Sequence, residues 1–164
     1  MLKYKIAILT ISDTGSKGKR IDQSSEEIKK LIMDLGEVVF YKIIPDEKNQ
    51  IISHLKNLVD KQKMDLIFTT GGTGFSPRDN TPEATKKVIE REIPGFPELM
   101  RFKTSEKTLK SYLSRSIAGI RKKSLIINLP GSPKAARECL EAIFSLLPHS
   151  LEIIQGKISE CGKN

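Results

Sequence analysis

The sequence has 164 residues, enough for one domain with one hydrophobic core, and its 28 Lys and Arg against 20 Asp and Glu give a net charge of +8. This charge attracts anions in general, but the absence of Trp and the scarcity of other aromatic residues argue against a stacking platform for single-stranded nucleic acid. The sequence has only two cysteines, far apart, which argues against a disulfide framework. Its N-terminal apolar run is too short for a signal peptide or a membrane span, so we expect a cytoplasmic protein.

The beginning of the chain predicts a strand followed by a helix. Residues 5–11 are nearly continuous in apolar side chains, as in a parallel strand that is buried on both faces. The helix is predicted over residues 24–35, because apolar residues recur there at helical spacing and Ser24 with Glu27 forms a capping box. Gly36 is the expected helix stop.

The next segment repeats this alternation of strand and helix. Residues 38–44 predict a second strand, and apolar residues at helical spacing between Ile51 and Val59 predict the helix after it. Residues 66–70 predict a third strand that ends at a cluster of glycines. Thr81-Pro82-Glu83 then has the features of a helix start: a capping hydroxyl, a proline at the first helical position and an acid in the first turn.

The second half of the chain predicts two more strands and a long helix. Residues 94–113 are mixed in pattern and are expected to be helical in parts. Residues 124–129 predict another buried strand, and residues 117–120 predict an antiparallel neighbour joined to it by a charged turn. Ser132-Pro133 starts the last helix, which is expected to end before Pro148.

Together, these elements predict one α/β domain over residues 1–164. Its core would be a single doubly wound, mostly parallel sheet with helices on both faces and an antiparallel edge strand. Ligands of such folds bind beyond the carboxyl ends of the strands. The loops expected to form the site are therefore the ones that follow Ile11, Ile44, Thr70 and Leu129.

The loop after the third strand is the richest in glycine. It contains Gly71, Gly72 and Gly74, where the backbone can adopt unusual turns and approach a phosphate closely. The helix that begins at Thr81 would add the positive end of its dipole. The loop has neither the Walker nor the G-x-G-x-x-G spacing, so a tight structural turn is the alternative to an anion site.

The loop after the last buried strand reads Pro130-Gly131-Ser132-Pro133-Lys134, again a glycine turn that leads into a helix. Ser132 is the expected N-cap. Lys134 would lie in the first turn, where a cation opposes the helix dipole unless an anion is bound. We interpret this lysine as a modest indication of an anion site, with a solvated surface residue as the alternative.

The remaining loops contribute acids. Asp13 and Asp46 follow the first two strands, and with Asp79 they would gather at one edge of the sheet beside the glycine loops. Carboxylates beside a phosphate site need a bridging cation, for which Mg²⁺ is the usual choice, although Asp46 could instead cap the next helix. Neither His54 nor His149 has metal-ligand or triad spacing, which argues against zinc chemistry and covalent catalysis.

Five stretches of the chain, in order, resemble one known family. They are Thr10-Ile11-Ser12-Asp13, Ile44-Pro45-Asp46-Glu47, residues 69–85 around Gly71-Gly72-Thr73-Gly74-Phe75, Leu113-Ser114-Arg115 and Asn128-Leu129-Pro130-Gly131. A lone Gly-Gly-Thr-Gly is common, but five ordered matches are specific. The sequence is similar to the molybdopterin adenylyltransferase family, which includes the N-terminal domain of gephyrin.

The resemblance implies a magnesium-dependent nucleotidyltransferase. Such enzymes join AMP from ATP to the terminal phosphate of molybdopterin, release pyrophosphate, and typically form trimers; a separate protein would then receive the product and insert molybdate. By the resemblance, Asp46 and Asp79 are the magnesium-linked catalytic acids. The residues implied to bind nucleotide phosphates are Ser12, Asp13, Gly71, Gly72, Thr73 and Gly74. Those implied to line the pterin pocket are Ser114, Arg115, Asn128, Pro130, Gly131 and Ser132.

The chain departs from the family pattern at two positions. Thr14 stands where many bacterial members have Arg, and Asn80 stands where Val is usual. Two other classes of protein are alternatives to the enzyme. The first is a pterin-binding or scaffold relative without turnover, which would not need both Asp46 and Asp79. The second is a basic nucleic-acid-binding protein, which only the net charge favours. The chemistry agrees with the enzyme, because a phosphate monoester is already anionic and needs no histidine or cysteine as a base.

Overall fold

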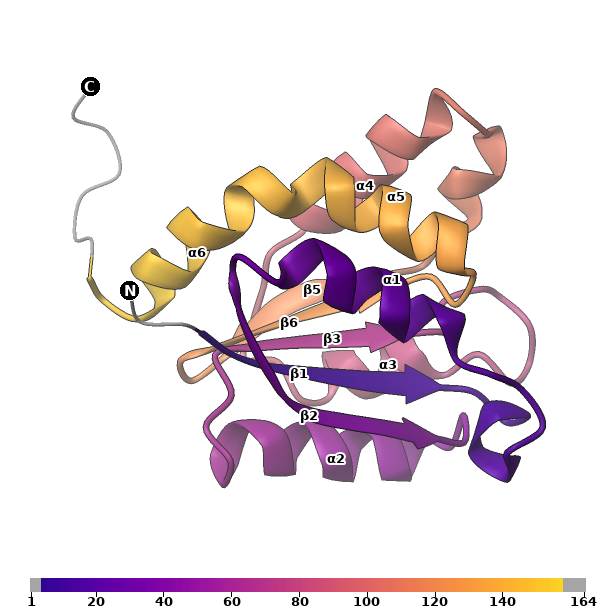
Figure 1. Ribbon diagram of the computed structural model, residues 1–164, viewed down its shortest axis with the longest axis horizontal. Helices are drawn as coiled ribbons and strands as arrows, with labels where there is room; N and C mark the ends of the chain where they lie inside the picture. The colour runs from indigo at the N-terminus through magenta and orange to yellow at the C-terminus, as the bar shows by residue number, and fades with distance from the viewer. Residues whose placement is uncertain (1–3, 158–164) are drawn as a thin grey trace.

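The computed structural model describes residues 4–157, which form one six-stranded sheet with helices on both faces (Figure 1). The strands are β1 (Tyr4–Ile11), β2 (Gly36–Ile44), β3 (Leu66–Thr70), β4 (Arg91–Glu92), β5 (Ala118–Arg121) and β6 (Ser124–Leu129). The α-helices are α1 (Gln23–Ile32), α2 (Lys48–Asp60), α3 (Thr81–Lys86), α4 (Gly95–Ser105), α5 (Pro133–Ile143) and α6 (Leu147–Ile154). Short 3-10 helices are η1 (Gly15–Lys17), η2 (Leu109–Leu113) and η3 (Phe144–Leu146). Cys161 and the first three residues lie outside the described range.

The sheet has the order β2-β1-β3-β6-β5-β4. The first four of these strands are parallel, whereas β5 pairs antiparallel with β6, and β4 pairs antiparallel with β5. The predicted fold class, including an antiparallel edge, is therefore confirmed. The two-residue strand β4 was not predicted, because so short a segment carries no alternation of apolar and polar residues.

Each face of the sheet buries its own hydrophobic cluster. Helices α1, α4, α5 and α6 cover one face, and α2 with α3 covers the other (Figure 1). The central strands β3 and β6 are buried along their whole length, as the continuous apolar runs predict. Cys139 is part of the first cluster, and its burial raises the pKa of the thiol to about 11, so it acts as a small hydrophobic residue rather than a nucleophile.

The first helix begins and ends differently from the prediction. Asp22, not Ser24, is its N-cap, because the Asp22 carboxylate accepts a hydrogen bond from the Ser25 N–H at 3.1 Å. The helix ends at Ile32, before the predicted stop. Gly36 is instead the first residue of β2, where it lies so close to the carbonyl of Tyr4 that a side chain would not fit.

Two later helix boundaries also differ. The N-cap of α3 is Asn80, and the Thr81 hydroxyl donates to the Gly71 carbonyl at 2.9 Å instead of capping the helix. Pro148 does not end the last helical segment: the chain turns through η3, and Pro148 lies in the first turn of α6, where a proline needs no N–H partner. The prediction of partial helix over residues 94–113 is confirmed by α4 and η2.

The two ends of the described chain meet at the amino ends of the parallel strands. The Lys157 ammonium lies 5.5 Å from the centre of the Tyr4 ring. Tyr4 begins β1, whose other end borders the loops predicted to form the site. No helix among residues 4–157 is long and apolar enough to cross a bilayer.

Candidate active site

A cavity of about 310 Å³ opens at the carboxyl ends of β1 and β3. These neighbouring strands lead to α1 and α3, which cover opposite faces of the sheet, so the cavity lies where the strand order reverses. Ligands of doubly wound folds bind at this point. The predicted site residues that line the cavity are Ser12, Gly71, Gly72, Gly131 and Ser132.

The glycine loop between β3 and α3 passes directly over a carboxylate. Gly71 and Gly72 have φ of 102° and 65°, a conformation that favours glycine. A Cβ atom on Gly72 would lie 2.5 Å from Oδ2 of Asp46, so only a glycine lets the backbone approach the acid this closely. At Gly74, where φ is not positive, a Cβ would lie 2.8 Å from Oδ2 of Asp79.

Asp46 is the buried acid of the site, with 6% of its surface exposed. Its Oδ1 accepts a hydrogen bond from the Asn80 N–H at 3.1 Å. Burial, followed by the negative charges of Asp79 and Asp13, raises the pKa of the Asp46 carboxyl to about 6, against the opposing effect of the Asn80 hydrogen bond. Asp46 does not cap α2, whose N-cap is Glu47, so the capping alternative is wrong.

Asp79 closes a turn in the same loop. Its Oδ2 accepts a hydrogen bond from the Ser76 N–H at 2.8 Å. Among residues 4–157, no donor bonds to Oδ1 of Asp79 or to Oδ2 of Asp46. Each acid therefore keeps one oxygen without a hydrogen-bond donor, and for Asp46 this oxygen, Oδ2, is the one that lies beside Gly72. Asn80 is one of the two departures from the family pattern. It donates to Asp46 through its backbone N–H, which any residue except proline would supply.

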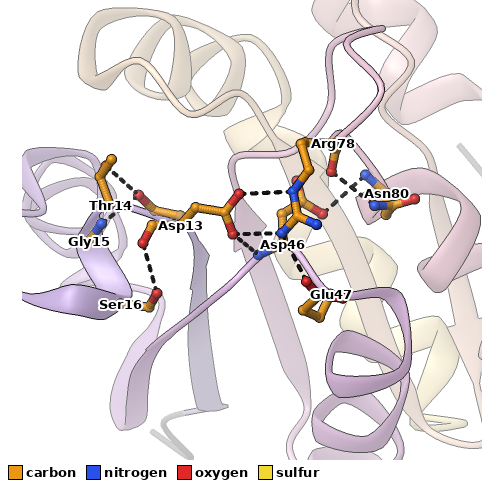
Figure 2. Close-up of polar contacts among 9 residues, drawn as sticks. Asp13, Thr14, Gly15, Ser16, Asp46, Glu47, Arg78 and Asn80 are labelled. Carbon is orange, nitrogen blue, oxygen red and sulfur yellow. Dashed lines mark hydrogen bonds and ion pairs between the residues drawn. The ribbon is translucent and has the colours of Figure 1, made fainter.

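Arg78 ties three loops together around Asp46 (Figure 2). Its Nε and Nη2 donate to the two oxygens of Asp13 at 3.1 and 3.0 Å, and Nη2 also donates to Glu47 at 2.9 Å. Oδ1 of Asp13 in turn accepts from the Asp46 N–H at 3.0 Å. These hydrogen bonds, that from Arg78 foremost, lower the pKa of Asp13, although burial opposes them. Sequence analysis assigned Arg78 no role, because spacing does not reveal a partner in another loop.

The two acids suit a cation that is shared with substrate. Within the described part of the chain, no three His, Cys, Asp or Glu side chains converge on one metal position. Mg²⁺ is commonly held by one or two carboxylates, with phosphate oxygens and water completing its coordination. The buried charge of Asp46 and the free oxygen of Asp79 fit this kind of site.

Two residues implied to contact the pterin, Arg115 and Asn128, form hydrogen bonds within the protein. Arg115 donates through Nε to the Gly74 carbonyl at 2.6 Å and through Nη2 to the Asp79 carbonyl at 2.9 Å, so it holds the glycine loop. Its N–H also donates to the carbonyl of Thr73, a buried residue. Asn128 is fully buried, and its Nδ2 donates to the hydroxyls of Thr69 and Thr85, both at 2.9 Å.

The other residues implied to bind the pterin divide between two pockets. Gly131 and Ser132 line the cavity at β1 and β3, and the Ser132 hydroxyl caps α5 as predicted, accepting from the Ala135 N–H at 3.1 Å. Ser114 and Pro130 line a second pocket of about 190 Å³ between α4, η2 and α5. Its walls are mostly apolar, which suits a ring system better than a phosphate.

Sequence analysis missed Asp22, which lines the cavity and organises its wall. The carboxylate accepts from the Thr10 hydroxyl at 2.5 Å, from the Tyr41 hydroxyl at 2.7 Å, and from Ser24 and Ser25 of α1. Burial alone would raise the pKa of Asp22, but these hydrogen bonds lower it to about 2. Its signal in the sequence was an N-cap pattern, masked by the apparent capping box two residues later.

Comparison with known proteins identifies the family. Residues 7–149 match the model described as a probable molybdopterin binding domain. A molybdopterin adenylyltransferase from Helicobacter pylori strain J99 is 47% identical over 159 residues, covering 95% of this chain and 90% of the relative. The molybdenum cofactor synthesis protein cinnamon from Drosophila melanogaster is 40% identical over 161 residues, covering 97% of this chain and 27% of that protein. The crystal structure of the molybdopterin biosynthesis enzyme MoaB from Thermus thermophilus superimposes with a TM-score of 0.90 at 46% identity, covering 96% of this chain and 99% of that one. This chain therefore belongs to the molybdopterin-binding domain family.

Proposed function

We propose that this protein is a cytoplasmic molybdopterin adenylyltransferase. It joins AMP from ATP to the terminal phosphate of molybdopterin and releases pyrophosphate. The observation that carries the proposal is the buried Asp46, held against the glycine backbone and close enough to Asp79 for that charge to raise its pKa. An uncompensated buried carboxylate lowers the stability of a fold, and a scaffold that only binds pterin would not need it.

In the proposed reaction, an oxygen of the molybdopterin phosphate attacks the α-phosphorus of ATP, and the bond from that phosphorus to pyrophosphate breaks. The attacking oxygen is already anionic, so the protein supplies alignment and charge neutralisation rather than a base. Asp46 and Asp79 would hold Mg²⁺, which when bound neutralises phosphate charge.

The remaining residues bind and orient the two substrates. The backbone of residues 71–74, with Ser12, would hold nucleotide phosphates. Asp13 would contribute by holding Arg78 at the edge of this site. Ser114 and Pro130 would contact the pterin. Arg115 and Asn128 act indirectly in this proposal, by fixing the glycine loop and the end of β6.

The assembly and partners follow from the same proposal. The chain, as one domain, would form homotrimers and pass its product to a separate protein that inserts molybdate. Its substrates are small molecules, molybdopterin and ATP, and neither nucleic acid nor membrane takes part.

The direct test is incubation with molybdopterin, ATP and Mg²⁺, with adenylylated product measured by chromatography. Wild-type protein should form product, and chelation of Mg²⁺ should abolish it. Asp79→Asn should lower the rate by about 10²–10³-fold, because it removes charge at the reacting centre, while molybdopterin binding stays within a few-fold. The matched control is Asp34→Asn, which removes an exposed carboxylate between α1 and β2. Absence of product from the wild type would overturn the function, and normal turnover by Asp79→Asn would overturn the role of that acid.

A further inference from the structure

The cavity at β1 and β3 continues into a groove of about 530 Å³ along α1 and α5. The two share four lining residues: Ile21, Asp22, Gln23 and Pro133. One cation lines the cavity, Arg20, which stands in the loop before α1. Lys134, in the first turn of α5, lines the adjoining groove. These two cations therefore border one continuous space.

Neither cation forms an ion pair with the acids that line this space. Glu26 pairs with Lys29 at 2.7 Å. Glu27 pairs with Lys30 at 2.6 Å and with Arg137 at 3.5 Å. The third lining acid, Asp22, accepts hydrogen bonds from hydroxyl groups and a backbone N–H. Within residues 4–157, Arg20 and Lys134 form no ion pair and no side-chain hydrogen bond.

We propose that Arg20 and Lys134 bind a phosphate group of the substrate in this space. Lys134 lies in the first turn of α5, at the positive end of the helix, where an ammonium group is unfavourable until an anion binds. A guanidinium such as that of Arg20 can donate two parallel hydrogen bonds to a phosphate, and an ammonium adds a point charge. Neither residue takes part in bond breaking; both are substrate-binding residues.

The chemistry leaves two sources for this phosphate: the polyphosphate of ATP and the phosphate monoester of molybdopterin. Both would reach the same glycine loop, because Gly71 and Gly72 line the cavity that contains Arg20. Identifying the source rests on the proposed function, whereas binding of a simple phosphate anion does not. The experiment therefore measures binding without turnover first and kinetics second.

The test compares two double variants with equal net charge. Arg20→Gln/Lys134→Gln removes the two cations of the site. Arg91→Gln/Lys123→Gln removes two exposed cations from β4 and from the turn between β5 and β6, at the far edge of the sheet. Thermal melts first establish that both variants fold. Binding of pyrophosphate and of inorganic phosphate is then measured by calorimetric titration. The site variant alone should bind one or both anions at least tenfold more weakly. The control should stay within twofold of the wild type.

The kinetic arm then identifies the source. A raised KM for ATP with weaker pyrophosphate binding assigns the space to the polyphosphate, and a raised KM for molybdopterin with weaker phosphate binding assigns it to the monoester. Equal anion affinity in the wild type and the site variant, or equal losses in both double variants, would overturn the inference. If the site variant loses anion binding but the wild type makes no adenylylated product, the anion site stands and the proposed function falls.

Discussion

The Asp46 side chain is buried against the glycine backbone. Its pKa of about 6 means that at neutral pH the folded protein keeps a buried charge that a bound cation would compensate. The unfolded state, with an ordinary aspartate pKa near 4, ionises more readily. Between about pH 4 and pH 6 the folded state therefore binds more protons, and stability falls as the pH rises through this window.

Replacing Asp46 with Asn should remove this dependence. Asp46→Asn keeps an acceptor for the Asn80 N–H but has no charge, so without divalent cations it should be more stable than the wild type at pH 7.5 by on the order of 2 kcal/mol. At pH 4.5 the difference should be smaller, about 1 kcal/mol, because the folded wild type is then mostly protonated while the unfolded state is still mostly ionised. Urea unfolding at the two pH values measures both quantities. The same pH dependence in the wild type and the variant would contradict the raised pKa.

At the level of single residues, what could be predicted from sequence was location rather than partners. The placement of Asp46 and Asp79 beside the glycine loop follows from strand order and loop position alone. That Arg115 and Asn128 are bonded inside the protein could not be predicted, because their partners, such as Gly74 and Thr85, are distant in the chain. A match to a family motif gives the positions of candidate site residues, but it does not show which bonds those residues form within the protein.

Among the elements, the glycine loop is packed most closely against a candidate site residue, Asp46. Gly72 is constrained twice, by its positive φ and by the closeness of the Asp46 carboxylate and the Thr81 hydroxyl. Gly18 has a similar φ, of 69°, but nothing lies within 4 Å of its hypothetical Cβ. The two glycines therefore separate backbone strain from displacement of the acid.

This contrast predicts different outcomes for the same substitution. Gly18→Ala should destabilise the protein by about 1 kcal/mol, the usual cost of a side chain in this backbone conformation, and should leave adenylyl transfer unchanged. Gly72→Ala should cost several kcal/mol more and reduce transfer by at least tenfold, because Asp46 must move. Denaturant unfolding and the product assay measure the pair. Equal effects of the two substitutions on transfer would show that the loop acts only as a turn.

Element boundaries were less predictable than element types. The capping box at Ser24 and the helix stop at Gly36 were plausible local patterns, yet Asp22 and strand pairing decided the structure. At Pro148, a residue that commonly ends helices instead begins one. In each case a neighbouring residue or strand overrode a signal that was correct for an isolated segment.

For the molecule as a whole, the alternation of apolar runs and helical periodicity was enough to predict five of the six strands and the antiparallel pairing of β5 with β6. The closeness of Lys157 to Tyr4 could not be predicted, because it depends on where α6 lies against the sheet. This closeness makes the molecule suitable for circular permutation, which is tolerated where chain ends are near and at the surface.

The test is a permutant in which a short glycine-rich linker joins residue 157 to residue 4 and the new ends lie between Lys122 and Lys123. This permutant should fold, and its affinity for ATP should stay within a few-fold of that of the wild type. The linker and the new ends both lie at the amino ends of the parallel strands, away from the loops of the site. Far-ultraviolet circular dichroism and calorimetric titration with ATP provide the measurements. A folded permutant that had lost ATP binding would mean that the original chain order supports the cavity.

The shared position of the ends also has a consequence for how the domain is built into longer polypeptides. Strand β1 runs for eight residues, from Tyr4 to the cavity at its carboxyl end, which is roughly 25 Å of extended chain. A domain fused before Tyr4 or after Lys157 would lie at the amino ends of the parallel strands, opposite the cavity, and would leave the cavity open. Fusion at either side thus needs no change in the loops of the candidate site. The much longer Drosophila relative shows that such a domain can exist as one part of a larger protein.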